Sequence, residues 1–397
     1  MKEGAHPLMW CHTHLHSTMI YLDNAATTRL DEHVLQVMLP WLGEDYGNAS
    51  ALYALGRRAR VAVEDARATI AALIGAEPAE VMFTSGGTEA NNTVLKSLAW
   101  QSRTIRTIAL STIEHHAILH VAEALAGQGV ELVFLPVDAA GFVKLDAVPW
   151  ERLDRPDVLI SVMHANNETG ALQPIAELRA RAPKALIHTD AVQSFGKVPF
   201  NVRQLGVDFA TLSAHKIHGP KGVGALYIRR GVALEPFIHG GGQERGRRGG
   251  TEPVALICGF AEAARSACAE MESRTRTMVH LRDMLLETLQ ARIPDIRINT
   301  PHHALPNILN ISFLDAERLD GEAILQLLDL RGIACSNGSA CTSGSPQPSH
   351  VLKAMGRSDA EARAAVRFSL SKDTTEEDVL TAASALAEIV AQMRSGD

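Results

Sequence analysis

The segment 213–222 (SAHKIHGPKG) places a lysine where covalent chemistry is favoured. Lys216 follows an apolar, strand-like run at 209–212 and precedes a Gly/Pro turn, so its side chain is held in place rather than freely solvated. A fixed amine is what Schiff-base formation with an aldehyde requires, above all with pyridoxal 5'-phosphate (PLP). Lys216 is therefore predicted to be the covalent anchor of PLP.

Two upstream motifs supply other groups that such a cofactor needs. Residues 84–88 (TSGGT), which include Gly87 and Thr88, leave a strand-like run and open a helix, so backbone N–H groups there can hold a phosphate. Asp190 ends the strand that the strand-like run 185–189 predicts, and a carboxylate is costly to bury there unless a cation pairs with it. A pyridinium N–H is such a cation, and a helix N-cap is the alternative use of this aspartate.

Three more polar residues lie in or after strand-like runs. His115 can stack on a cofactor ring or move protons, with a capping or surface role as the alternative. Asn167, in HANNETG at 164–170, suits a bound carboxylate or a cofactor hydroxyl, with an Asn-rich turn as the alternative. Arg367 favours a planar anion such as a substrate carboxylate, with an internal salt bridge as the alternative.

Cys341 is the candidate nucleophile. It lies in a small, polar, Gly-containing stretch at 335–346 (CSNGSACTSGSP), which predicts a mobile loop and an exposed thiol. An exposed thiolate can react, whereas a free cysteine is usually buried and inert. Cys335 follows the apolar pair 333–334 and is expected to be packed.

Composition limits the class of protein. The 397 residues suffice for two domains, and 46% hydrophobic with 21% charged residues is ordinary for a globular protein. The net charge of −7 argues against nucleic acid or an anionic membrane as partner. No apolar run reaches the roughly 18 residues that span a bilayer. Five cysteines without a CxxC pair argue against a disulfide framework and favour a reducing cytoplasm.

The first 19 residues differ from the rest of the chain. They carry four histidines with Cys11, a combination able to bind a metal, and they lack the apolar core of a signal peptide. We expect residues 1–19 to be a disordered extension, or to precede a true start at Met19.

Strand-like runs alternate with helical intervals over the first two thirds of the chain, which predicts a mostly parallel sheet covered on both faces. After Pro253 a long run of helical periodicity, 254–289, introduces a smaller α+β domain, which the extended segment 20–22 is expected to join. The predicted domains are 30–262 for the large part, and 20–29 together with 263–397 for the small part. The seven predicted strands of the large domain are 81–84, 107–111, 131–137, 158–163, 185–189, 209–212 and 224–228.

These motifs, together with YLDNAATT at 21–28, GGGQERGRRGGT at 240–251 and GSACTS at 338–343, resemble the cysteine desulfurases of the NifS/IscS group. This group belongs to the class V aminotransferases, among the fold type I PLP enzymes. The resemblance extends over nearly the whole chain after Met19. It implies the aspartate aminotransferase-like fold of PLP-dependent transferases, with a seven-stranded, mostly parallel sheet in the large domain.

The resemblance implies how the cofactor is held. Lys216 forms the Schiff base and later moves the substrate α-proton, Asp190 holds the pyridinium nitrogen, and the catalytic His115 stacks on the ring. A homodimer is implied as well, with one cofactor contact coming from the other subunit. The remaining cofactor-binding residues are Gly87, Thr88, Asn167, Gln193, Ser213 and His215, with Thr251 from that other subunit.

The resemblance also implies the reaction. Asn24, Asn167 and Arg367 bind L-cysteine, the Cys341 thiolate attacks the substrate sulfur, alanine leaves, and Cys341 keeps a persulfide. The acceptor would be a NifU- or IscU-like Fe–S scaffold protein, with which the Cys341 persulfide would share a transient Fe–S cluster, its one implied metal contact. The alternatives are a donor for tRNA thiolation or molybdenum-cofactor synthesis, a selenocysteine lyase, or another PLP aminotransferase. Residues 165–170, 243–251 and 348–351 favour the nitrogen-fixation branch.

Overall fold

The computed structural model describes residues 19–338 and 347–395, so the predictions for residues 1–18 and for Cys341 lie outside the described residues. Its centre is a seven-stranded sheet, in which β8 runs antiparallel to both of its neighbours and all other neighbouring strands are parallel. The α/β class and the mostly parallel seven-stranded sheet are thereby confirmed. In spatial order the strands are β2 (Val81–Thr84), β8 (Gly224–Ile228), β7 (Phe209–Ser213), β6 (Leu186–Asp190), β5 (Val158–Ser161), β3 (Thr107–Ser111) and β4 (Glu131–Leu135).

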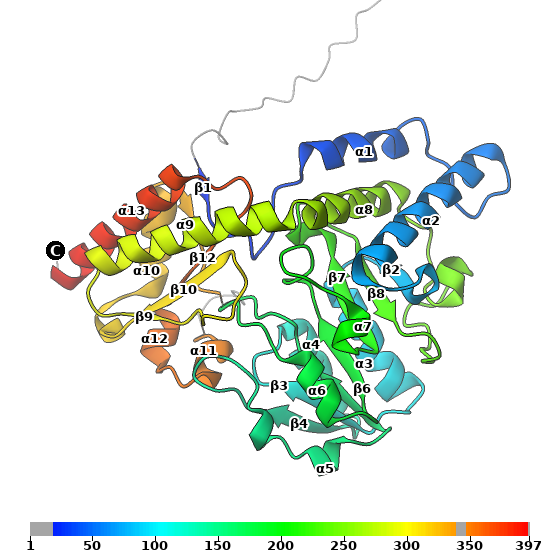
Figure 1. Cartoon of the computed structure of the whole chain (residues 1–397), viewed down its shortest axis with the longest axis horizontal. Helices are drawn as coiled ribbons and strands as arrows, with labels where there is room; N and C mark the ends of the chain where they lie inside the picture. Colours follow the sequence, from blue (N-terminus) through cyan, green and yellow to red (C-terminus); the bar gives the residue numbers. More distant parts are fainter. Residues whose placement is uncertain (1–18, 339–346, 396–397) are drawn as a thin grey trace, which may run out of the picture.

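Helices cover both faces of this sheet (Figure 1). Strand β8 shows why, since Ala225 and Tyr227 belong to one hydrophobic cluster and Leu226 and Ile228 to another. Because successive side chains of a strand point to opposite faces, a strand buried throughout needs a layer on each side. The helices of this part are α1 (Glu32–Leu42), α2 (Ala54–Ile74), α3 (Gly87–Lys96), α4 (His116–Ala126), α5 (Trp150–Leu153), α6 (Ile175–Arg181), α7 (Val202–Leu205) and α8 (Val254–Ala269).

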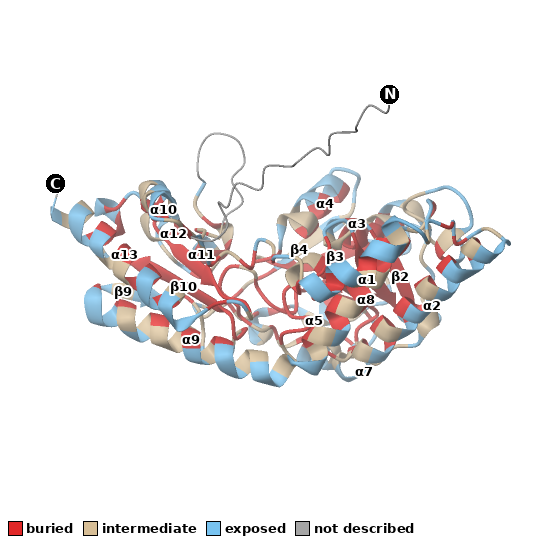
Figure 2. Ribbon diagram, turned by 90° about the horizontal axis from the view of Figure 1, so that it is seen from above, coloured by how far each residue is buried: buried red, intermediate tan, exposed pale blue. Residues whose placement is uncertain are grey.

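A smaller α+β part has its own hydrophobic cluster. Its antiparallel sheet has the order β12–β10–β9, and a separate parallel pair joins β1 to β11. The burial pattern in Figure 2 places its buried residues on the sheet and on the inner helix faces. The elements are β1 (Ile20–Tyr21), α9 (Met271–Arg292), β9 (Ile296–Ile298), β10 (Ile308–Phe313), α10 (Gly321–Leu330), β11 (Ile333–Ala334), α11 (His350–Ala354), α12 (Asp359–Arg363), β12 (Val366–Ser369) and α13 (Glu376–Ser395).

The helical run expected at 254–289 is divided in two. Helix α8 ends at Ala269 and α9 begins at Met271, because Glu270 takes a non-helical ψ of 6°. The two helices follow each other nearly in line and connect the two parts (Figure 1). The pairing of β1 with β11 brings residues 20–21 to the smaller part. The domain boundaries given above stay a prediction.

A buried ion pair fixes the Gly-rich segment 240–251. The Arg67 guanidinium donates to both carboxylate oxygens of Glu244, at 2.6 and 3.0 Å, and both side chains are 4% exposed. Glu244 also accepts the backbone N–H of Phe83 in β2, at 3.0 Å. The segment is thus tied to α2 and β2, beside the loop of Gly87.

Glu244→Ala is expected to lower the free energy of unfolding by about 3–5 kcal/mol, because Arg67 would be left buried without its anion. Denaturant unfolding measures this loss. The matched control is Glu64→Ala, which removes a half-exposed partner of the same arginine and should cost less than about 1 kcal/mol. Equal losses in the two variants would contradict the assignment.

Candidate functional site

A cavity of about 380 Å³ opens beside the carboxyl ends of β5, β6 and β7 and is closed by residues of the smaller part. In a parallel sheet this edge is where ligands bind. Asn24 and Thr251 do not line it, and Cys341 lies outside the described residues. The structure brings together ten of the predicted site residues on its walls: Gly87, Thr88, His115, Asn167, Asp190, Gln193, Ser213, His215, Lys216 and Arg367.

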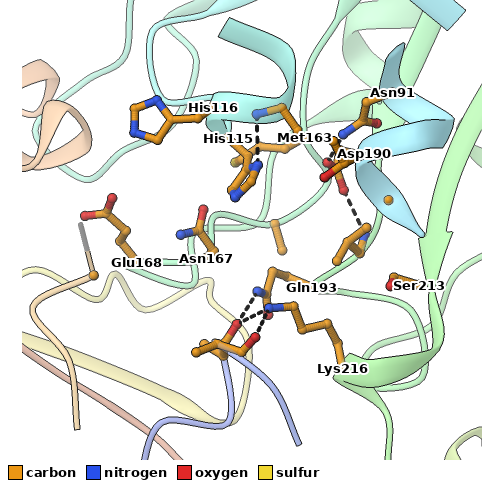
Figure 3. A pocket seen from close by; sticks show the side chains of 18 of the residues that line it. Asn91, His115, His116, Met163, Asn167, Glu168, Asp190, Gln193, Ser213 and Lys216 are labelled. Carbon is orange, nitrogen blue, oxygen red and sulfur yellow. Dashed lines mark hydrogen bonds between the residues drawn. The ribbon is translucent and has the colours of Figure 1, made fainter. Parts of the chain in front are cut away.

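Lys216 comes from the short turn that follows β7, and its amine points into the cavity (Figure 3). Its Nζ donates to the carbonyl oxygens of Ala25 at 2.5 Å and Ala26 at 2.6 Å. Burial, and then the nearby Arg367 guanidinium, lower the pKa of this amine to about 8. At neutral pH the neutral, nucleophilic form of this amine is therefore far more populated than that of a solvated lysine.

Asp190, the last residue of β6, is a buried carboxylate without a basic partner. It accepts hydrogen bonds from Asn91 Nδ2 at 2.7 Å and from the Val192 backbone N–H at 2.9 Å. Among the described residues no lysine, arginine or histidine lies within ion-pair distance of it. A ring N–H⁺ inserted into the cavity would supply the missing cation, so Asp190 fits the pyridinium nitrogen of PLP.

The loop before α3 fits a phosphate. Gly86 takes a φ of +150°, leaves the N-terminus of α3 without a side-chain cap, and has open space where a Cβ would stand. Free N–H groups at a helix start attract anions. The Ser213 hydroxyl is buried and lacks a partner among the described residues, which is what a phosphate acceptor would satisfy. Burial, followed by Lys216 and Lys221, lowers the pKa of His215 to about 4, so its ring is neutral.

His115 is the N-cap of α4 and faces the cavity (Figure 3). Its Nδ1 accepts the backbone N–H of Ala117 at 3.0 Å, so the proton of the neutral ring is on Nε2. Burial lowers its pKa, which favours this neutral form. The capping role expected as the alternative is therefore present together with the position at the site. Gln193 lies nearby and donates from Nε2 to the Ala25 carbonyl at 2.9 Å.

Arg367 is shared between the cavity and an internal contact. Its Nη2 pairs with Asp23 at 2.6 Å and its Nη1 donates to the Asn167 carbonyl at 3.0 Å. The salt bridge expected as the alternative is therefore present. The Arg367 Nε is buried and has no partner among the described residues. A guanidinium has five N–H donors, so this contact leaves capacity for a further anion.

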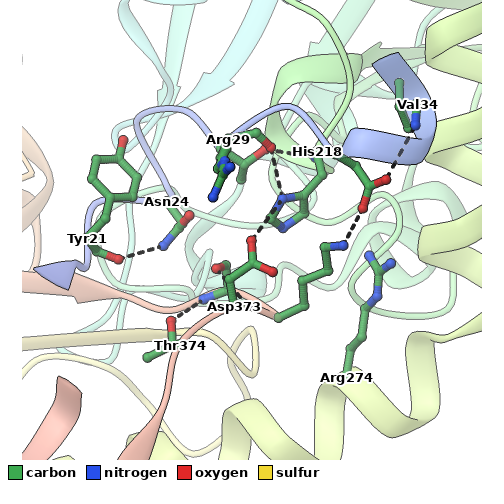
Figure 4. A network of polar contacts seen from close by, with 12 residues as sticks. Tyr21, Asn24, Arg29, Val34, His218, Arg274, Asp373 and Thr374 are labelled. Atoms are coloured by element: carbon green, nitrogen blue, oxygen red, sulfur yellow. Dashed lines mark hydrogen bonds and ion pairs between the residues drawn. The ribbon is translucent and has the colours of Figure 1, made fainter. Parts of the chain in front are cut away.

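The structure does not bring Asn24 to the cavity. Its side-chain amide donates to the backbone carbonyls of Ser369 at 2.9 Å and Tyr21 at 3.2 Å, in the polar network around His218 and Asp373 (Figure 4). The amide thus ties β1 to β12, and its role in binding the substrate stays a prediction. Thr251 is exposed on the surface of this chain. Its role in a neighbouring subunit stays a prediction.

Cys335 is packed, as its apolar neighbours indicated. It contacts the hydrophobic cluster of the smaller part, and burial raises the pKa of its thiol to about 12. A thiol with such a pKa carries almost no thiolate at neutral pH, so Cys335 is a poor nucleophile.

Sequence reasoning missed several residues of the cavity wall, of which Asn91 and Glu168 bear most on its chemistry. Asn91 holds Asp190, and its spacing from Gly87, one helical turn further on, was the signal that placed it on the same face. Glu168 is 2% exposed and lines the cavity, but nothing in the Asn-rich motif around it indicated that its carboxylate would be buried there. Within the described parts, no group of three or more potential ligand side chains is arranged to hold a metal, and no helix is long and apolar enough to cross a bilayer.

Comparisons with known proteins identify the class. The model of the aminotransferase class-V family matches residues 20–381, so the chain belongs to this family. Cysteine desulfurase IscS of Dictyoglomus turgidum is 45% identical over 380 residues, which cover 95% of each chain. Cysteine desulfurase NifS of Azotobacter vinelandii is 44% identical over 381 residues, or 95% of this chain and 94% of the relative. A solved NifS-like protein superposes with a TM-score of 0.86 at 40% identity, covering 94% of this chain and 99% of the other.

These relatives confirm three predictions: the resemblance to the NifS/IscS cysteine desulfurases, the enzymatic activity of that type, and PLP as cofactor. The near-equal identities to an IscS and a NifS do not separate the two branches.

Proposed function

We propose that the cavity holds PLP through Lys216 and removes the sulfur of L-cysteine, leaving L-alanine and a persulfide on Cys341. The observation that carries the proposal is that one cavity contains both the Lys216 amine, whose pKa is lowered, and the buried Asp190 carboxylate, which lacks a cation. Lys216, Asp190 and the uncapped start of α3 would hold the aldehyde carbon, the ring nitrogen and the phosphate in turn.

Bound PLP would supply an electron-withdrawing ring that stabilises negative charge at the substrate α-carbon. The chain's own residues would hold the cofactor, move the protons and orient the substrate. The Asp190 carboxylate, fixed by Asn91, keeps a proton on the ring nitrogen. The Lys216 amine accepts and returns the α-proton, and its pKa of about 8 suits that exchange near neutral pH. His115 Nε2 holds a proton at the cavity wall, and Arg367 with Asn167 orients the substrate carboxylate.

Purified protein incubated with L-cysteine and a reductant tests this function. Alanine and sulfide should appear in equal amounts, because every sulfur removed leaves one alanine. Absence of both products would overturn the proposal. Conversion of a 2-oxo acid without sulfur release would favour an aminotransferase instead.

A homodimer is part of the proposal and is supported by exposed apolar side chains in the segment from α1 to the start of α2. Leu52 is 84% exposed and Tyr46 is 75% exposed, with Leu39, Leu42 and Tyr53 nearby in sequence. Several large apolar side chains exposed within one segment are typical of a protein contact. In the proposed homodimer, Thr251 of the other subunit would contact the cofactor phosphate. Sedimentation should give the mass of two chains, and a monomer at micromolar concentration would contradict this.

We further propose a cytoplasmic location and an Fe–S scaffold protein as sulfur acceptor. Support comes from the composition and from the family resemblance. Incubation of the persulfide-loaded protein with a NifU- or IscU-like scaffold should move labelled sulfur to the scaffold, and failure of this transfer would point to another acceptor.

A further inference from the structure

Glu168 is a buried acid on the wall of the cavity that the proposed reaction does not use. Its side chain is 2% exposed and lies beside Asn167 (Figure 3). The Ser349 hydroxyl donates to its Oε2 at 2.5 Å, and a Cβ built on Gly338 would stand 3.0 Å from the same oxygen. No basic side chain among the described residues pairs with it. A carboxylate buried in this way favours its protonated form.

Among the described residues, Arg367 is the only arginine that lines the cavity, and more than one carboxylate lies near it. Arg367 already pairs with Asp23 at 2.6 Å, and it is the charged group whose field reaches Glu168. A ligand carboxylate bound to Arg367 would be a second anion on this cation, and an ionised Glu168 would be a third. Like charges that crowd one site cannot all stay ionised, and the group without its own cation takes up a proton first.

Among the other titratable groups around Glu168, Glu114 also titrates near neutral pH, because burial raises its pKa to about 8, and Glu168→Gln leaves that group unchanged. On α11, His350 donates from Nε2 to the Glu114 carbonyl at 2.9 Å, and burial lowers its pKa. Beside β11, burial keeps the Cys335 thiol protonated. Lys216, on the opposite side of the cavity, would be engaged by the cofactor. Burial raises the pKa of Glu168 to about 7, against the lowering effects of Ser349 and Arg367.

We propose that Glu168 is a positioning residue that takes up a proton when Arg367 binds the carboxylate of the substrate. This inference rests on the proposed function. The sign follows from charge: neutral Glu168 admits the ligand carboxylate and ionised Glu168 repels it, so affinity is highest below neutrality and falls as pH rises. By linkage, carboxylate binding must draw a proton from solution.

The test uses the PLP-loaded enzyme and propionate, a carboxylate without an amine or thiol that could react at the site. Titrations between pH 6 and 8.5, followed by the cofactor absorbance, should show the Kd of propionate rising about tenfold with pH, as expected for a coupling of this type. Calorimetry in buffers of different ionisation enthalpy should show proton uptake on binding. Glu168→Gln, whose amide oxygen still accepts from Ser349, should bind with a Kd that varies less than about twofold and without proton uptake.

Controls separate this inference from the function on which it rests. Glu388→Gln removes an exposed charge on α13 and should behave as the unmodified enzyme. Arg367→Gln should weaken propionate at every pH. If Arg367→Gln has no effect, or propionate does not bind at all, the carboxylate site of the proposed function is wrong. If Arg367 matters but Glu168→Gln keeps the pH dependence and the proton uptake, the role of Glu168 is wrong while the proposed function stands.

Discussion

Lys216→Ala is expected to lose the yellow absorbance of the protein-bound cofactor and to reduce cysteine turnover by roughly 10²–10⁴-fold, the usual contribution of a proton-transfer group. The reason lies in the geometry around the amine. Its Nζ is held by the carbonyls of Ala25 and Ala26, and its pKa of about 8 leaves neutral amine available. No other amine of the described residues lines this cavity. Absorbance and alanine formation, measured on the same preparation, check both effects.

The matched control is Lys184→Ala, which removes a surface amine that is 69% exposed and does not line the cavity of Lys216. It should keep the absorbance and the turnover. Borohydride reduction followed by peptide mass analysis should find the cofactor on Lys216 in the unmodified protein. An adduct on a different lysine, or an unchanged yellow band in Lys216→Ala, would refute the assignment of the anchor.

Cys341→Ala is expected to stop sulfur transfer, with a loss of roughly 10³-fold or more, because removal of a nucleophile leaves no route to the covalent intermediate. The cofactor should still bind and its spectrum should still respond to cysteine, since Lys216, Asp190 and Arg367 line the cavity independently of this residue. The measurements are alanine release and persulfide detection by mass. This split between binding and turnover distinguishes a lost nucleophile from a damaged fold.

Cys335→Ala is the comparison for that variant. Cys335 is packed in the smaller part with a pKa of about 12, so its removal should leave turnover nearly unchanged. Persulfide found on Cys335, or full activity of Cys341→Ala, would show that the nucleophile has been misassigned.

The sequence alone predicted the site residues whose positions are set by neighbouring residues of the chain. Asp190 ends one buried strand and Lys216 follows the next, and parallel strands end at one edge of a sheet, so their convergence follows from the order of the elements. Gly87 was predicted for a similar reason, since a glycine turn between strand and helix creates its anion site from backbone N–H groups of its own neighbourhood.

The tertiary structure decided the contacts between residues far apart in the chain. It gave Arg367 an ionic partner in Asp23, turned the Asn24 amide toward Ser369, and placed Glu168 against Ser349. The residue types alone permit several partners for each of these groups. The choice depends on how the two hydrophobic parts pack and on which polar atoms are then removed from water. Burial also shifts the pKa values of Glu168 and Lys216, because a side chain loses its hydration only once the folded chain surrounds it.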